Sequence, residues 1–281
     1  MKRSAHLHYL VAAAVLLCAN SIAAVAWGTI GHETIVAIAE RHLSPQAKKN
    51  IGKYISYDLV KDARWMDRHR SDPQLLYAYH FHEQCINLET LEYDPNAQVQ
   101  YGDATRALCL AKYNMSHRSH LSDSVVVLNI RMALHFIGDL HCPVHIGIPG
   151  IWFPKPPYRQ DVGKWYFRGT AYQSFHKLID LAPGLIYPGM DAFEIAEKID
   201  KVSKGQARKW VKGDFIDWTN DSAKRGYRIY EHFPPLWEIP DTPQAKFIPD
   251  DFLDKTKDIL TEELLKAGYQ LAFLLNQCFD N

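Results

Sequence analysis

Apolar residues recur along this chain mainly three or four positions apart, which is the spacing of a helix with one buried face. This spacing predicts helices over residues 32–43, 122–140, 171–180 and 250–279. Ser44-Pro45-Gln46 predicts a further helix start, because proline is favoured in the first turn. Strand-like alternation is scarce, and residues 164–169 form the best short candidate. The pattern predicts a mainly α-helical single domain with a few short strands.

One long segment, residues 146–163, breaks the helical pattern. It reads IGIPGIWFPKPPYRQDVG, and its proline and glycine content predicts a loop. Loops of this length inside a compact domain are often functional. Stacking on nucleic-acid bases and packing in the core are both open for the aromatic residues around it: Trp152, Phe153, Tyr158, Trp165, Tyr166 and Phe167.

Residues 1–26 differ in composition from the rest of the chain. Two basic residues precede an apolar stretch over 9–19, and the small-x-small sequence AVA at 24–26 precedes Trp27. This pattern is typical of a secretory signal peptide, so we expect a mature domain over 27–281 that is secreted or periplasmic. An uncleaved membrane anchor is the alternative, although the apolar stretch is shorter than the roughly 20 residues of a typical membrane span.

Composition fits one globular domain and excludes one class of partner. The 281 residues are 47% hydrophobic and 23% charged, with 32 basic and 32 acidic side chains. Removal of Lys2 and Arg3 with the signal peptide leaves a slightly acidic chain. Such a chain does not hold long duplex DNA by charge alone. A nucleic-acid enzyme remains possible, because bound metal ions supply local positive charge.

Cysteine usage suggests disulfides rather than a thiolate zinc site. Four cysteines follow the signal peptide, and an even number in an oxidising compartment suggests two disulfides with three possible pairings. The near pair Cys85–Cys109 is our preferred bond, which leaves Cys142–Cys278. No Cys-x-x-Cys spacing is present.

Two histidine–aspartate pairs have the spacing of metal ligands on a helix. His135 and Asp139 are four residues apart, as are His176 and Asp180, so each pair shares one helix face. Imidazole and carboxylate groups that converge from one face are typical zinc ligands where thiolates are absent. The two pairs therefore predict a metal site in a helical domain.

The same stretch contains two more histidines that lie off this face. His141 is six residues after His135, about 240° around a helix of 3.6 residues per turn, so it points elsewhere. His145 follows Pro143, beyond the end of the helix, and can reach a different point. The stretch is therefore expected to serve more than one metal ion, with His141 outside the ligand set.

These residues belong to a longer series of motifs. In chain order the motifs are WGTIGH (27–32), ARWMDRHR (63–70), YHFHE (79–83), HFIGDLHCPVH (135–145), FHKLID (175–180), WTNDS (218–222) and KAGYQLAFLLN (266–276). Together they resemble, in the same order, the zinc-dependent single-strand nuclease family of fungi, plants and trypanosomatids, to which bacterial zinc phospholipase C is related. The resemblance covers about residues 27–279 and implies the mainly α fold of the phospholipase C and single-strand nuclease type.

The resemblance further implies three zinc ions. Two would form a close pair bridged by Asp139, and a third would lie apart. The first zinc of the pair would be bound by Asp67, His80, His135 and Asp139. The second would be bound by His32, Asp139 and the free amine and carbonyl of Trp27, which makes cleavage before Trp27 part of the chemistry. The third would be bound by His145, His176 and Asp180.

Four further roles come with the resemblance. Asp67 would orient the attacking water as well as bind zinc, and Arg70 would donate to the phosphate. Phe81 would stack on a base, and Glu83 would take the place of a base-contacting aspartate.

The match to the family is incomplete in places. His80 and His82 compete for one ligand position, and the His-Phe pattern favours His80. Ser174 replaces a family asparagine, Ile179 replaces a tryptophan, and DVGK at 161–164 stands where a Gly-Gly-Asn is usual. These positions bear on substrate preference rather than on metal binding.

The expected function is that of a secreted zinc endonuclease on single-stranded RNA and DNA, which leaves 5′-phosphates and also acts on 3′-nucleotides. The alternative with the same metal core is a zinc phospholipase C. The proline-rich loop with its aromatic residues is compatible with this alternative. A non-catalytic zinc-binding protein is a third possibility. No stable protein partner is implied, and a monomer is expected.

Overall fold

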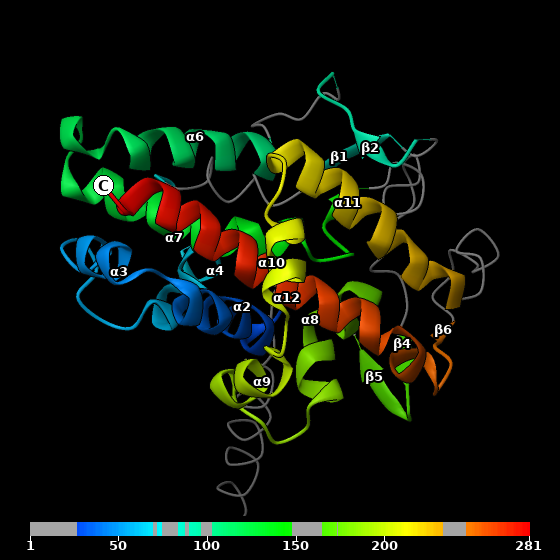
Figure 1. The fold of residues 1–281 in the computed structure, drawn as a ribbon. Helices are drawn as coiled ribbons and strands as arrows, with labels where there is room; N and C mark the ends of the chain where they lie inside the picture. The colour runs from blue at the N-terminus through cyan, green and yellow to red at the C-terminus, as the bar shows by residue number, and fades with distance from the viewer. Residues whose placement is uncertain are drawn as a thin grey trace, which may run out of the picture.

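The structure of the chain is a computed structural model that describes residues 27–69, 72–74, 84–87, 90–96, 103–147, 165–172, 174–232 and 246–281. Most of these residues are helical, as Figure 1 shows. The α-helices are α2 (Thr29–His42), α3 (Pro45–Ile51), α4 (Trp65–Arg68), α6 (Ala104–Ser116), α7 (Asp123–Leu140), α8 (Phe175–Ile186), α9 (Ala192–Ile199), α10 (Lys204–Trp210), α11 (Phe215–Tyr227) and α12 (Phe252–Phe279). Short 3₁₀ turns are η1 (Leu59–Asp62), η3 (Arg118–His120) and η4 (Arg228–His232). The mainly α fold class predicted from the sequence is confirmed.

Short strands in the described residues form two small sheets. One has the order β2-β1-β3, with β1 (Gln84–Asn87), β2 (Glu92–Tyr93) and β3 (Ile146–Gly147). The other has the order β5-β4-β6, with β4 (Trp165–Phe167), β5 (Thr170–Tyr172) and β6 (Lys246–Phe247). In each sheet the central strand pairs antiparallel with one neighbour and parallel with the other.

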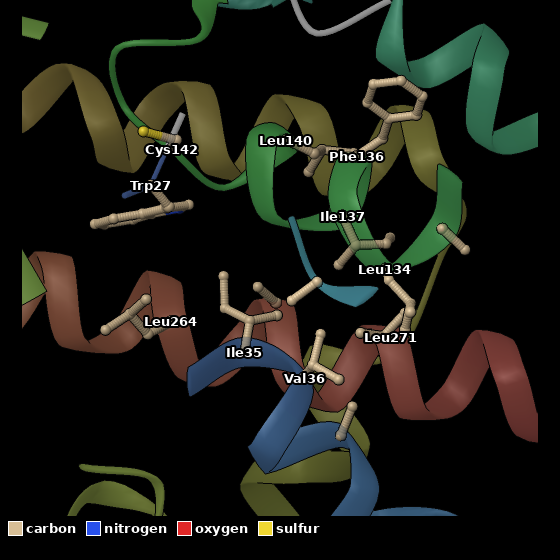
Figure 2. Packing of buried hydrophobic residues seen from close by; sticks show 14 of the residues in the cluster. Trp27, Ile35, Val36, Leu134, Phe136, Ile137, Leu140, Cys142, Leu264 and Leu271 are labelled. Carbon is tan, nitrogen blue, oxygen red and sulfur yellow. The ribbon is translucent and has the colours of Figure 1, made fainter. Parts of the chain in front are cut away.

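The core lies where α2, α7 and α12 pack against one another (Figure 1). Figure 2 shows side chains of all three helices meeting there, among them Ile35, Ile137 and Leu271. Helices α2 and α12 approach closely at Gly268, where a Cβ would lie 2.5 Å from the Ile38 side chain. The absence of a side chain at Gly268 therefore lets these two helices cross in contact.

Most of the helices predicted from the pattern begin and end near the expected residues. The predictions 32–43, 122–140 and 250–279 correspond to α2, α7 and α12. The predicted helix start at Ser44 is also present, because Ser44 Oγ accepts a hydrogen bond from the Ala47 amide at the start of α3. The spacing of apolar residues predicts these helices well because each helix packs one long face against the core.

The helix predicted over 171–180 begins too early. Residues 170–172 form β5 instead, and α8 starts at Phe175. Ser174 is extended and its Oγ accepts a hydrogen bond from the Lys177 amide, so it caps the helix and ends the strand segment. Arg168 and Gly169 have φ angles of 48° and 76°, which fits a two-residue hairpin turn between β4 and β5.

The predicted disulfides are absent, because Cys109, Cys142 and Cys278 are all free thiols. Cys278 Sγ lies 3.5 Å from Ser116 Oγ, near the start of α7, whereas Cys142 follows the end of that helix. The 18 residues of α7 span about 27 Å at 1.5 Å per residue, far beyond the roughly 7 Å limit between bridged Cα atoms. Cys109 is exposed on α6.

Several predictions concern residues outside the described ranges. Among them are the signal peptide (1–26) and residues 148–163 of the proline-rich loop. Within the described part of the chain, no helix is long and apolar enough to cross a membrane.

Candidate metal centre

The buried end of α7 provides the first two candidate ligands. His135 and Asp139 lie one turn apart on the face that packs against α2, and both are almost fully buried. His135 Nε2 lies 3.3 Å from Asp139 Oδ2. The helical spacing seen in the sequence therefore brings the imidazole and the carboxylate together.

Helix α2 adds His32 on the other side of Asp139. His32 Nε2 lies 3.4 Å from Asp139 Oδ1, and the His32 and His135 rings stack with centroids 4.4 Å apart. A Cβ at position 138 would lie 2.6 Å from His32 Nδ1, so Gly138 makes room for this ring against α7. The two oxygens of Asp139 thus face histidines from two different helices.

Asp67, in the short helix α4, completes this first group. Its Oδ1 lies 3.7 Å from His135 Nε2, and its Oδ2 lies 3.7 Å from Arg64 Nε. The His135 Nδ1 atom faces the Ala63 carbonyl oxygen at 3.3 Å, which directs Nε2 toward the two carboxylates. Ligand atoms of His32, Asp67 and His135 all lie within 4.8 Å of one another.

A second group forms where the turn after α7 meets α8. His145 Nε2 and His176 Nε2 face each other at 3.1 Å, and His176 Nε2 lies 3.3 Å from Asp180 Oδ1. The Asp180 carbonyl accepts a hydrogen bond of 2.7 Å from the Gly28 amide. This bond ties the start of the described chain to α8, directly beside the second group.

Cys142 lies beside the second group, although no metal role was predicted for it. Its Sγ lies within 4.8 Å of ligand atoms of both His145 and Asp180, and all three residues are buried. Figure 2 shows Cys142 next to Trp27 at one end of the core cluster. The three-residue spacing of Cys142 and His145 across Pro143 is the sequence signal that could have identified it.

Burial sets the charge states in both groups. Burial lowers the pKa of His135, against the opposing effect of Asp139 and Asp67, which favours the neutral imidazole that binds metals. Burial also raises the pKa of the Asp180 carboxyl. For His176, burial lowers the pKa but the adjacent Asp180 raises it more, so the net shift is upward.

Buried carboxylates need a nearby positive charge, and here few side chains supply one. Oδ2 of Asp67 and Oδ2 of Asp180 are both buried without a hydrogen-bond partner among the described residues. Asp139 is fully buried between two imidazoles. Histidine nitrogens and carboxylate oxygens converging around such atoms fit divalent metal ions, zinc in particular.

The sequence profile of the S1/P1 nucleases matches residues 27–280. The chain belongs to the S1/P1 nuclease family. This membership confirms the family resemblance and the prediction of a hydrolase that cleaves phosphodiester bonds.

Similar members of the family come from fungi and plants. Nuclease PA3 of a Penicillium species is 24% identical over an alignment of 275 residues, which covers 89% of this chain and 97% of the relative. Nuclease P1 of Penicillium citrinum is 28% identical with the same coverage of both chains. Endonuclease 2 of Arabidopsis thaliana is 22% identical and covers 90% of each chain.

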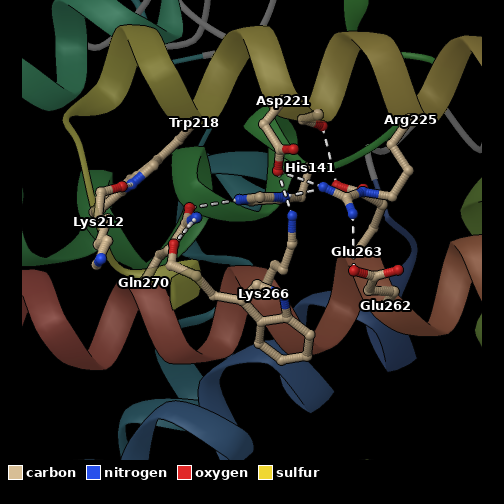
Figure 3. Close-up of polar contacts among 11 residues, drawn as sticks. His141, Lys212, Trp218, Asp221, Arg225, Glu262, Glu263, Lys266 and Gln270 are labelled. Carbon is tan, nitrogen blue, oxygen red and sulfur yellow. Dashed lines mark hydrogen bonds and ion pairs between the residues drawn. The ribbon is translucent and has the colours of Figure 1, made fainter. Parts of the chain in front are cut away.

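In this S1/P1 nuclease, His141 points away from both ligand groups, as the helix geometry predicted. It ends α7, and it lies in a polar network between α7, α11 and α12 (Figure 3). Its Nδ1 lies 2.7 Å from Glu263 Oε2 and its Nε2 lies 2.8 Å from Gln270 Oε1. The Gln270 amide nitrogen donates to the Trp210 carbonyl, which fixes Oε1 toward His141.

Sequence analysis did not identify the remainder of this network. Glu263, which is fully buried, also accepts a hydrogen bond from Ser222 Oγ at 3.0 Å and pairs with Arg225. Asp221 pairs with Arg225 and with Lys266. The network anchors the turn between Asp139 and His145, which connects the two ligand groups. The motif at 218–222 and the final helix supply its residues.

The structure describes most but not all of the predicted ligands. It brings His32, Asp67, His135 and Asp139 together in the first group, and His145, His176 and Asp180 in the second. Trp27 is fully buried beside Cys142. Four predicted site residues lie outside the described ranges: Arg70, His80, Phe81 and Glu83, together with the alternative ligand His82.

Proposed function

We propose that this S1/P1 family member is a secreted, zinc-dependent endonuclease on single-stranded RNA and DNA that leaves 5′-phosphates and also hydrolyses 3′-nucleotides. One observation carries the proposal. The two oxygens of the buried Asp139 face histidines of two different helices, at 3.4 Å and 3.3 Å. A carboxylate in this position suits a bridge between two cations that act on one phosphate.

The proposed ligand sets follow the two groups. Asp67, His80, His135 and Asp139 would hold one zinc ion, and His32, Asp139 and the amine and carbonyl of Trp27 would hold its neighbour. His145, His176 and Asp180 would hold the third. The two groups are close enough to interact electrostatically, since Asp139 raises the pKa of His176 and His32 lowers that of Asp180.

Bound zinc supplies Lewis-acid activation of water and of phosphate oxygens. The protein's own groups orient the reactants around it. Asp67 has one oxygen toward His135 and the other without a hydrogen bond, so it can accept a proton from the attacking water. Arg70 donates to the phosphate oxygens as negative charge develops on them. Stacking on Phe81 and a polar contact from Glu83 position the base next to the scissile bond.

The relatives support a nuclease over a lipase. Those that cover most of the chain are named Nuclease PA3, Nuclease P1 and Endonuclease 2, and the match extends over nearly their whole length. We propose single-stranded nucleic acid and 3′-nucleotides as the substrates, with the mature chain acting as a monomer after export and signal-peptide cleavage before Trp27.

The direct test combines metal analysis with four substrates. The purified protein is analysed for metal content and offered single-stranded RNA, single-stranded DNA, 3′-AMP and phosphatidylcholine. We expect about three zinc ions per chain and hydrolysis of the first three substrates. Release of phosphocholine alone would contradict the nuclease and indicate a phospholipase C. Bound zinc without hydrolysis of any substrate would indicate a zinc-binding protein.

A further inference from the structure

Cys142 lies where a metal ligand could lie, although it is not among the proposed ligands. Its Sγ lies within 4.8 Å of ligand atoms of His145 and Asp180. Cys142 and Asp180 are at most 1% exposed, and His145 is 4% exposed. A buried thiol next to an imidazole nitrogen and a carboxylate oxygen is a set of donors that zinc binds strongly.

Asp180 provides an independent indication that a cation belongs at this point. One of its oxygens lies 3.3 Å from His176 Nε2, but Oδ2 is buried without a hydrogen-bond partner among the described residues. The nearest imidazoles, His145 and His176, face each other through their Nε2 atoms at 3.1 Å. Two imidazole nitrogens and a carboxylate oxygen therefore converge on one point, as the ligands of a metal ion do.

The backbone explains why the sulfur faces this point. Cys142 follows the last turn of α7, and the His145 amide donates a hydrogen bond of 2.9 Å to the Cys142 carbonyl. The resulting four-residue turn brings its first and last residues close together, and the Cys142 sulfur lies within 4.8 Å of a His145 ring nitrogen. The hydrogen bonds of His141 to Glu263 and Gln270 fix the residue just before this turn.

We propose that the Cys142 thiolate is a fourth protein ligand of the third metal ion, so that this site is His145, His176, Asp180 and Cys142. The inference rests on the proposed metal centre and adds a sulfur donor to it. On metal binding the thiol proton passes to solvent and a sulfur–metal bond forms, with no oxidation of either partner. A thiolate favours softer ions than imidazole and carboxylate do, so the third site should prefer zinc or cobalt over magnesium or manganese.

Cobalt substitution gives a readout that does not depend on activity. The purified protein is stripped of metal, loaded with Co²⁺, and examined for the near-ultraviolet absorption that thiolate-to-cobalt charge transfer produces. We expect this absorption in the wild type and its loss in Cys142→Ser. The matched control is Cys278→Ser, which also removes a fully buried thiol but lies at the opposite end of α7 and should retain the absorption.

X-ray absorption at the zinc edge of the wild type tests the same bond without any substitution, so the inference does not depend on folding of the variant. We expect a zinc–sulfur shell at about 2.3 Å. A wild type that carries its full metal content but shows neither signal would overturn the sulfur ligand and leave the proposed metal centre standing. Persistence of the absorption in Cys142→Ser would also overturn it. A wild type that binds no metal would overturn both.

Discussion

At the scale of single residues, the candidate centre depends on carboxylates that are buried next to histidines. Asp139 is fully buried and lies between His32 and His135. An ionised carboxylate in a protein interior is costly, and bound cations offset part of that cost. In the proposed centre, Asp139 would be the residue shared by the two neighbouring metal ions.

Asp139→Asn should therefore separate metal binding from folding. We expect activity to fall by more than about 100-fold, a larger loss than changes outside the ligand set produce. We also expect the metal-free variant to melt no lower than the metal-free wild type, since a buried carboxylate is replaced by a neutral amide of similar shape. We would test these expectations by measuring the metal content, the nuclease rate, and the melting temperature with and without a chelator. Asp123→Asn, at the exposed start of the same helix, is the control. Unchanged metal content in Asp139→Asn would contradict the bridging role.

Glu263 should stabilise the folded protein, because its negative charge is compensated by Arg225. It is fully buried against Arg225, with His141 and Ser222 on its other oxygen. Glu263→Gln should lower the free energy of unfolding by about 3 kcal/mol, the typical cost of removing one partner from a buried ion pair. Glu262→Gln is a close control, since Glu262 pairs with the same Arg225 but its side chain is 40% exposed. Its loss should be below about 1 kcal/mol. The free energies of unfolding of both variants are measured with urea. Equal losses in the two variants would contradict this account of the network.

At the scale of elements, α2 and α12 cross in close contact at Gly268. Gly268→Ala adds a Cβ that would lie 2.5 Å from Ile38 and 3.2 Å from the Ile35 carbonyl oxygen. Alanine favours a helix by about 1 kcal/mol over glycine, but forcing two packed helices apart costs about 1–3 kcal/mol. We expect a net destabilisation in thermal unfolding. Gly184→Ala in α8, where the nearest atom is 3.9 Å away, should be neutral or stabilising. A higher melting temperature in Gly268→Ala would show that α2 and α12 are not tightly packed at this crossing.

Asp200 links three elements and should make stability depend on pH. Burial raises the pKa of its carboxyl, but hydrogen bonds from Arg41, Tyr269 and His42 lower it more, so the net shift is downward. A carboxyl with a lowered pKa in the folded state stabilises the fold above its unfolded pKa of about 3.9, and this contribution is lost as pH falls through the folded value. We expect Asp200→Asn to flatten the fall in stability between about pH 5 and pH 2, measured on metal-free protein. Asp258→Asn, at an exposed position of α12, should leave the slope unchanged.

How well the sequence predicts the structure also differs from element to element. The long helices α7 and α12 were predictable because each keeps one apolar face over many turns. The start of α8 was not, because β5 forms only through pairing with β4, which helical spacing does not reveal. Among site residues, the pairs on one helix were predictable from spacing alone. The position of Glu263 was not, because it depends on contacts with His141 and Ser222, each more than 30 residues away, which the spacing of neighbours does not encode.

At the scale of the whole molecule, the centre is assembled from the beginning, middle and end of the domain. Trp27 and His32 come from its start, and α7 and α8 supply the two histidine–aspartate pairs from its middle. The network of α11 and α12 supports the turn between those pairs. Metal binding should therefore stabilise distant parts of the chain together, because a ligand that binds only the folded state shifts the whole unfolding equilibrium.

The proposed cleavage before Trp27 gives the sharpest test of this assembly. Trp27 is fully buried, and the Gly28 amide donates a hydrogen bond to the Asp180 carbonyl, so the backbone here is tied to α8. If the Trp27 amine and carbonyl bind a metal ion, one additional glycine before Trp27 removes the amine from the site and places a peptide bond there. We expect that variant to lose metal and most activity, while its metal-free form melts like the metal-free wild type. An additional glycine after Asn281, at the exposed end of the chain, should change neither. Full activity in the amino-terminal variant, with its first residue verified by mass spectrometry, would rule out the main-chain ligand.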